Sequence, residues 1–227
     1  MELLEGIRTR KSIRAFKSEA VPDKVIMDVL ETAIRAPSGV NLQPWEFLVV
    51  RGAVLEEFRK ANVEEYRLGR EPTPEIPMRN TIDGAPELTG VFRERKVALA
   101  KQLFALLGIS KGDKKRQSEH MENMNGFYGA PAVIVIVCDK NLVGGWPIID
   151  IGFVAQNITL AAQAHGLGTC VMRAIVDYPD HVRRILRIPV SKRIIVGIAI
   201  GYPDWDHPIN RLKTDREKIE NVVRFVE

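Results

Sequence analysis

One helix constrains the fold of this chain more than any other segment. Residues 148–165 have helical spacing, are rich in Ala and Ile, and are apolar on nearly every side. A helix of this kind belongs in a protein core or at a large subunit interface, because either place removes its apolar surface from water. The chain must therefore cover this helix with its own elements or with a second polypeptide.

Buried strands and amphipathic helices alternate along the rest of the chain. The expected strands are residues 45–51, 132–138, 168–172 and 193–200. The other expected helices are residues 22–36, 53–61, 88–107 and 179–187, with a charged connection at 111–119. Because the strands are few and widely spaced while helices dominate, an α+β sandwich fits this order better than a wound parallel sheet.

Two segments depart from this regular order. Residues 68–87 contain several prolines and glycines, so they cannot sustain one regular element. We expect them to form a long irregular excursion, which either covers a site as a lid or forms a loop at a subunit interface. Residues 210–227 are expected to form a C-terminal arm, whose β-branched end at 219–225 extends to pair with a partner chain. Both segments are expected to belong to a single domain spanning residues 1–227.

The composition narrows the class of protein. A chain of 227 residues with 45% hydrophobic content can bury a real core, and a net charge of +4 is too small to predict a nucleic-acid partner. The N-terminus lacks the continuous apolar stretch of a secretory signal. The longest apolar run, 132–138, is far below the ~20 residues of a membrane-spanning helix. With Cys138 and Cys170 expected to be buried thiols, we predict a cytoplasmic protein.

The N-terminal region contains the densest cluster of cations. An extended backbone would place Arg10, Ser12 and Arg14 on one side, where two guanidinium groups and a hydroxyl suit a phosphate. A solvated charged turn is the alternative interpretation of this cluster taken alone. Residues 210–216 form a second basic cluster, and the two clusters could meet on one phosphate, whose charge is close to two negative units.

A polar turn at residues 37–45 forms the third group. Ser38, Asn41 and Gln43 offer donors and acceptors that suit the edge of a flat heterocycle or a ribityl chain. Asn and Ser also form ordinary turns, so this segment gains weight only together with the two basic clusters.

Other chemistries find little support in the sequence. The glycines of residues 166–171 superficially match a dinucleotide fingerprint, but they leave a helix to enter a strand, whereas the fingerprint needs the reverse order. The four histidines are scattered without a metal-binding spacing, so we expect no metal. Neither a G-x-S-x-G motif nor a Walker loop is present.

Taken together, these segments resemble the nitroreductase family over nearly the whole chain except residues 68–87. The matching segments are residues 10–14, 37–45, 129–131, 156–157, 166–169, 201–203 and the basic tail. The resemblance implies a three-layer α/β/α sandwich with a mainly antiparallel sheet, in an intertwined homodimer that holds two FMN molecules at its interface. It also implies a ping-pong transfer of hydride from NADH or NADPH to a nitroaromatic, quinone or related small-molecule acceptor, with the cofactor rather than a catalytic side chain carrying the chemistry.

The resemblance also implies roles for individual residues. Those that would bind the FMN phosphate and ribityl oxygens are Arg10, Lys11, Ser12, Arg14, Lys213 and Arg216. Those that would reach the flavin of the opposite protomer are Pro37, Ser38, Gly39 and Asn41. Backbone amides of residues 172–174, including Met172 and Arg173, would face the N5 and O4 edge of the flavin.

One position departs from the family pattern. Many members have an acidic residue followed by glycine where this chain has Arg173 and Ala174. Backbone donors survive this change, but a cation here should favour the anionic reduced flavin, and with it an anionic substrate.

Three alternatives remain open at this point. A reductive dehalogenase resembling iodotyrosine deiodinase is one, although its expected Glu four residues before Tyr66 is replaced by Asn62. A non-catalytic flavin-binding protein and a basic nucleic-acid binder are the others. The branch that cleaves flavin to make dimethylbenzimidazole has less support than these.

Overall fold

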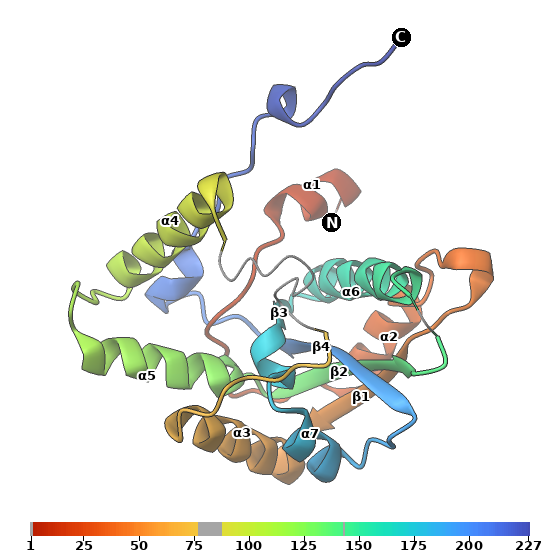
Figure 1. Cartoon of the computed structure of the whole chain (residues 1–227), viewed down its shortest axis with the longest axis horizontal. Coiled ribbons are helices and arrows are strands. Elements are labelled where there is room, and N and C mark those ends of the chain that lie inside the picture. Colours follow the sequence, from red (N-terminus) through yellow and green to blue (C-terminus); the bar gives the residue numbers. More distant parts are fainter. Residues whose placement is uncertain (1, 77–87, 143) are drawn as a thin grey trace.

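A four-stranded antiparallel sheet forms the centre of the molecule (Figure 1). The computed structural model describes residues 2–76, 88–142 and 144–227. The strands are β1 (Glu46–Arg51), β2 (Ala132–Asp139), β3 (Gly168–Met172) and β4 (Lys192–Gly201), in the order β1-β2-β4-β3. Each neighbouring pair is antiparallel. All four strands were expected from the sequence within a residue or so.

Helices cover both faces of this sheet. Ile134 and Ile136 of β2 face α2 (Asp23–Ala33) and α6 (Trp146–Ala164), whereas Val133 and Val135 face α3 (Gly52–Arg67) and α7 (Pro179–Leu186). A strand buried on both faces has no polar side, which is why β2 is a continuous apolar run. The three-layer α/β/α sandwich predicted from the sequence is confirmed.

The apolar helix α6 packs with only one side in the core. Ile151, Val154 and Ile158 point inward and are almost fully buried. Trp146, Ile149 and Phe153 lie on the other side and remain exposed, Trp146 by 71%. The chain by itself therefore leaves a large apolar stripe of α6 in contact with water.

The remaining helices are α1 (Leu3–Thr9), α4 (Gly90–Leu106) and α5 (Lys114–Asn125). The expectation of a charged connection at 111–119 was wrong, because most of that segment belongs to α5. Its first turn is capped by the carboxylate of Asp113, which accepts a hydrogen bond from the N–H of Arg116 at 3.1 Å. Lys, Arg, Gln and Glu are good helix formers, so this segment can form a helix although it lacks the apolar periodicity by which a helix is predicted. Helix α3 likewise runs six residues beyond the 53–61 segment expected for it.

The end of the C-terminal arm projects away from the body of the molecule (Figure 1). Apart from the single turns Pro208–Arg211 and Ile219–Asn221, residues 208–227 contain no helix or strand. Ile219, Val222 and Phe225 are exposed, Phe225 by 88%. The pairing of residues 219–225 with a partner stays a prediction. None of the described helices combines the length and apolar content that crossing a bilayer requires.

Candidate functional site

The N-terminal basic segment lies in extended form along the edge of the sheet. Ser12 forms a parallel bridge with Thr169 of β3, and the N–H of Ile13 donates to the carbonyl of Thr169 at 2.9 Å. Because side chains alternate along an extended backbone, the buried side chain of Ile13 lies opposite those of its neighbours Ser12 and Arg14. The extended geometry expected for residues 10–14 is therefore present.

A glycine makes this close approach feasible. A Cβ atom at Gly168 would lie 2.4 Å from Cγ1 of Ile13 and 2.9 Å from Cγ of Pro203, which is too close for any side chain. The glycine pattern at residues 166–171 thus serves strand packing, because it lets the N-terminal segment contact the start of β3. This agrees with the rejection of a dinucleotide fingerprint there.

The two basic clusters meet in space, as the sequence suggested. Burial and the nearby guanidinium of Arg216 lower the pKa of Arg10, in that order. Burial and then the ammonium of Lys213 lower the pKa of Lys11. Cations from opposite ends of the chain therefore lie close enough to repel one another.

Lys11 is held in place by neutral groups. Its Nζ donates to the carbonyl of Asn210 at 2.7 Å and lies 4.8 Å from the centre of the Trp205 ring. A cation over an aromatic face is attracted by the negative face of the ring. Beside this contact lies a cavity of about 340 Å³, lined by Thr9, Arg10, Lys11, Ile13, Thr159, Gln163, Leu167, Gly168, Thr169, Pro203 and Trp205.

The donor chemistry of this cluster fits a phosphate. Gathering like charges at a partly buried place costs free energy, and a bound anion would offset that cost. Arginine and lysine side chains, with the hydroxyl of Ser12, supply charged and neutral donors of the kind that phosphate oxygens accept. Among the described residues, by contrast, no group of three or more His, Cys, Asp or Glu side chains could hold a metal ion.

The polar turn at residues 37–45 is attached to the other end of α6. The N–H of Gly39 donates to both carboxylate oxygens of Asp150 at 3.2 Å, and the N–H of Gln43 donates to Oγ of Ser38 at 3.0 Å. Val40 and Asn41 have positive φ angles, and Val40 is 92% exposed. The turn thus presents its tip outward, away from its own core.

Within one chain the turn and the basic cluster do not meet. Asp150 holds the turn near the start of α6, whereas Thr159 and Gln163 line the cavity beside Arg10 near its end. Nine to thirteen residues of helix separate these positions, which corresponds to about 14–20 Å along the axis. The structure therefore brings residues 10–14 to Lys213 and Arg216, but it does not bring Pro37, Ser38, Gly39 or Asn41 to them.

Arg173 does not present a free charge. It follows β3 directly, and its guanidinium forms an ion pair with Asp177, a carboxylate buried in the next turn of chain. Burial raises the pKa of Asp177, and the cation of Arg173 acts in the opposite direction. The preceding residue, Met172, has a buried side chain, so only its backbone is left to face a ligand.

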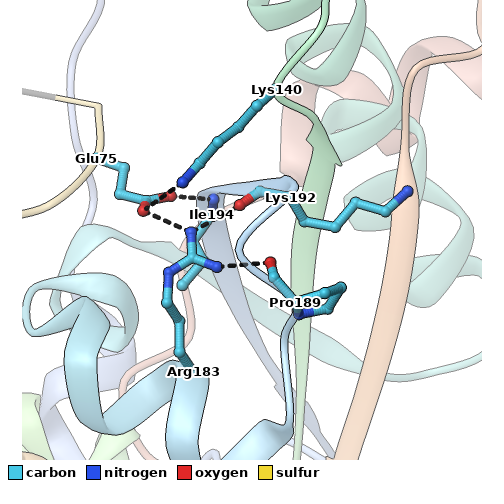
Figure 2. A network of polar contacts seen from close by, with 6 residues as sticks. All are labelled: Glu75, Lys140, Arg183, Pro189, Lys192 and Ile194. Carbon is cyan, nitrogen blue, oxygen red and sulfur yellow. Dashed lines mark hydrogen bonds and ion pairs between the residues drawn. The ribbon is translucent and has the colours of Figure 1, made fainter.

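The first part of the excursion is fixed to the body of the protein. Glu75 inserts its carboxylate between α7 and the start of β4, where it contacts Arg183 at 2.5 Å and accepts the N–H of Ile194 at 2.6 Å (Figure 2). The N–H of Thr73 donates to the carbonyl of Asp177 at 2.8 Å. Residues 68–76 therefore form an anchored segment without a helix or strand. Residues 77–87 lie outside the described residues, so the role of the excursion 68–87 as a lid or an interface loop stays a prediction.

A buried polar group underlies the basic segment. Tyr128 is buried, and this burial raises its pKa to about 12, against the opposite effect of the nearby Arg14. Burial also raises the pKa of Cys170, while Arg14 and the hydroxyl of Ser12 act in the opposite direction. Both cysteines are free and buried, which confirms the sequence interpretation of them as structural thiols.

Three residues that contribute to this region were missed at the sequence level. In the sequence Asn210 is only the first residue of a basic run, and neither Trp205 nor Asp150 belongs to a recognisable motif. The signal for Asp150 was available, because a lone carboxylate in an otherwise apolar helix needs a partner. Nothing local to Asn210 or Trp205 indicates contacts with residues almost 200 positions away.

Comparison with known proteins agrees with this geometry. A model described as the nitroreductase family matches residues 7–202. A 4-nitrobenzoate reductase from Nocardioides sp. (strain LMS-CY) is 32% identical, covering 97% of this chain and 88% of the relative. The solved FMN-dependent nitroreductase NfnB from Mycobacterium smegmatis, in complex with NADPH, is 30% identical with a TM-score of 0.89, covering 99% of this chain and 97% of that one. The FMN and NADPH-dependent NfnB of Sphigopyxis sp. strain HMH is 28% identical with a TM-score of 0.92, covering 100% of both chains.

Fold and site together define an α/β/α sandwich that gathers cations at the edge of its sheet. The family model covers most of the chain, and the relatives match it over nearly their full lengths. This chain belongs to the nitroreductase family.

Proposed function

We propose that this chain is an FMN-dependent oxidoreductase that passes hydride from NADH or NADPH to a nitroaromatic or a related electron-poor acceptor. The convergence of Arg10 and Lys11 with Lys213 and Arg216 carries this proposal, because it creates a site for a dianionic phosphate on a sheet edge. The similar solved proteins support the choice of cofactor and donor, since one is an FMN-dependent nitroreductase in complex with NADPH and the other is FMN and NADPH-dependent. Nitrobenzoate reduction by a relative supports the acceptor class.

The side chains of this protein bind and orient rather than react. Arg10, Lys11, Ser12, Arg14, Lys213 and Arg216 would hold the phosphate and ribityl oxygens of FMN. Backbone N–H groups near Met172 and Arg173 would face the polar edge of its ring. When bound, FMN supplies the hydride chemistry for both donor and acceptor, so no acid–base pair of the protein is needed.

A second copy of the chain completes the site in this proposal. The turn at residues 37–45 lies about 14–20 Å along α6 from the basic cluster of its own chain and presents its tip outward, so in this proposal it contributes Pro37, Ser38, Gly39 and Asn41 to a neighbouring chain. The exposed apolar stripe of α6 supports the same arrangement, because burying Ile149 and Phe153 against a second copy removes them from water. One FMN-binding domain, formed by residues 1–227, would contribute to two sites in a homodimer. The cytoplasmic location expected from the sequence stays a prediction.

The dehalogenase alternative is less well supported. Asn62, which stands at the position of the expected Glu, has a fully buried side chain that donates to the carbonyls of Asn125 at 2.8 Å and Ala174 at 3.0 Å. A side chain at this position of α3 faces the core and is not available to a substrate.

An anaerobic titration tests the proposed function. Purified protein should carry the absorbance of FMN and lose it on addition of NADH or NADPH, then regain it when a nitroaromatic is added. A non-catalytic flavin-binding protein would hold FMN without bleaching. Colourless protein that cannot be reconstituted with FMN, together with nucleic-acid binding that falls steeply with salt, would overturn the proposal in favour of a nucleic-acid binder.

A further inference from the structure

Asn210 connects the two ends of the chain, because its side-chain NH₂, its side-chain oxygen and its backbone carbonyl all form hydrogen bonds. It lies in the turn Pro208–Arg211 and is only 2% exposed. Its side-chain NH₂ donates to the carbonyls of Ala15 and Asp204, both at 2.8 Å. Its side-chain oxygen accepts the N–H of Arg14 at 2.8 Å, and its own carbonyl accepts Nζ of Lys11 at 2.7 Å.

Two of these four bonds reach Lys11 and Arg14 of the N-terminal basic segment, and a third reaches Ala15, which directly follows it. They fix the backbone of Arg14 and Ala15 and the ammonium of Lys11 against the first turn of the C-terminal arm. Lys213 and Arg216 follow Asn210 within six residues, and the side chain of Leu212, between Asn210 and Lys213, is also buried. The position of Asn210 therefore determines where the second pair of cations lies relative to the first.

The cations themselves cannot provide this organisation. After burial, the nearby Arg216 is the next cause of the lowered pKa of Arg10, and Lys213 is the next cause of the lowered pKa of Lys11, so the cations of each pair repel one another. Without a neutral connection, the exposed arm would lower its free energy by moving its charges away. A buried amide with every donor and acceptor satisfied supplies such a connection at no electrostatic cost.

We propose that Asn210 is a positioning residue that assembles the phosphate-binding half of the cofactor site before the ligand arrives. This inference rests on the proposed function, because it assumes that the ligand is FMN and that its phosphate is held by the two basic clusters. It adds that the preference for FMN over riboflavin, which lacks the phosphate, depends on an uncharged residue that need not touch the ligand.

The ratio of riboflavin to FMN dissociation constants provides the test. The two ligands differ only in the phosphate, so a general loss of stability or a distorted ring site changes both constants together, whereas loss of phosphate organisation changes the ratio. For Asn210→Ala we expect the ratio to fall about tenfold, the factor that corresponds to losing one charge-assisted hydrogen bond. Both constants are measured by flavin fluorescence quenching on apoprotein, with folding checked by circular dichroism.

Asn62→Ala is the matched control. Asn62 is also fully buried and also donates to two backbone carbonyls, but neither of them belongs to the basic clusters. We expect this variant to lose stability as Asn210→Ala does and to keep the wild-type ratio. If Asn210→Ala does not fold, Asn210→Ser is used instead, because its hydroxyl keeps one donor and one acceptor. This variant should also lower the ratio of riboflavin to FMN dissociation constants.

The outcomes separate this inference from the proposed function. Wild-type protein that binds FMN no more tightly than riboflavin would contradict the phosphate site, and with it both proposals. Wild-type protein that prefers FMN, with folded Asn210 variants that keep the wild-type ratio, would overturn the role of Asn210 alone. An equal fall in Asn62→Ala would also overturn it.

Discussion

Nη1 of Arg173 lies 2.5 Å from Oδ1 of Asp177, and the Asp177 side chain is 4% exposed whereas that of Arg173 is 36% exposed. The pair joins the residue that departs from the family pattern to a carboxylate in the core. Because the carboxylate of Asp177 largely neutralises the charge of Arg173, the electric field of Arg173 at the proposed flavin ring is weaker than the sequence alone implied. The position still distinguishes this chain, but as part of a pair.

We predict that Arg173→Ala lowers the free energy of unfolding by about 1–3 kcal/mol at neutral pH, because Asp177 is left buried without its partner. Burial already raises the pKa of Asp177 above its ordinary 3.8, and losing the cation raises it further. Since the folded state then holds a proton that the unfolded state has released, stability falls as pH rises above about 3.8. Urea unfolding at several pH values should show the gap between wild type and variant growing with pH. Arg173→Lys is the control that keeps the charge, and a gap that is constant with pH would contradict the prediction.

Glu75 should determine how firmly residues 68–76 are held. Glu75→Gln removes the ion pair with Arg183 while leaving an oxygen for the N–H of Ile194. We expect faster hydrogen exchange at the amide of Thr73, which donates to Asp177 in the same segment. Glu71→Gln changes an exposed carboxylate of this segment and should leave that exchange rate as it is. Equal rates in wild type and Glu75→Gln would refute the anchoring role.

Tyr128 should make the protein sensitive to alkali. Its folded-state pKa of about 12 lies above the ordinary 10.0, so the unfolded chain ionises first as pH rises. Stability is therefore lost between pH 10 and pH 12, by up to roughly 2–3 kcal/mol for this group. In Tyr128→Phe that part of the loss should disappear, which unfolding curves at pH 9 to pH 12 would reveal. Identical pH slopes in the two proteins would rule the effect out.

The apolar stripe of α6 should govern assembly and cofactor content together. Phe153→Glu places a charge on the exposed side of α6, where the proposed second copy would bury it at a cost of several kcal/mol. We expect a monomer in sedimentation experiments and loss of bound FMN, although Phe153 lies far from the basic cluster along the helix. Val190→Glu alters another exposed apolar residue, in the turn before β4, and should preserve both properties. A Phe153→Glu monomer that keeps its FMN would contradict the shared site.

Local patterns were enough to predict most of the fold. The four strands were predicted from runs of β-branched residues, and helix α6 from its continuous apolar character. Both signals reflect the burial of the segment and can be recognised without knowing its partners. Helix α5 was missed for the opposite reason, because its residues are nearly all polar and its support comes from a cap and from good helix formers. The motif of residues 10–14 was found because several chemically distinctive residues are adjacent in the chain.

Contacts between distant segments could not be predicted in the same way. The bonds of Asn210 to Lys11 and Arg14 span nearly the whole chain, and an asparagine two residues after a proline is otherwise an ordinary turn residue. The pairing of Arg173 with Asp177 spans only four residues, yet its importance depends on the burial of Asp177, which tertiary packing determines. The ion pair of Glu75 with Arg183 has no sequence signal, because the two residues are far apart in the chain and the sequence offers many other charged residues that could pair with either of them.

The separation that α6 imposes between the turn at 37–45 and the basic cluster has a genetic consequence in the proposed dimer. Each complete site takes its cations from one chain and its turn from the other. A chain altered at Arg10 and a chain altered at Ser38 would each form homodimers without an intact site. Their mixed dimer would combine both defects in one site and leave the other site wholly wild type, so two inactive alleles expressed together would yield mixed dimers that each have half of the wild-type activity.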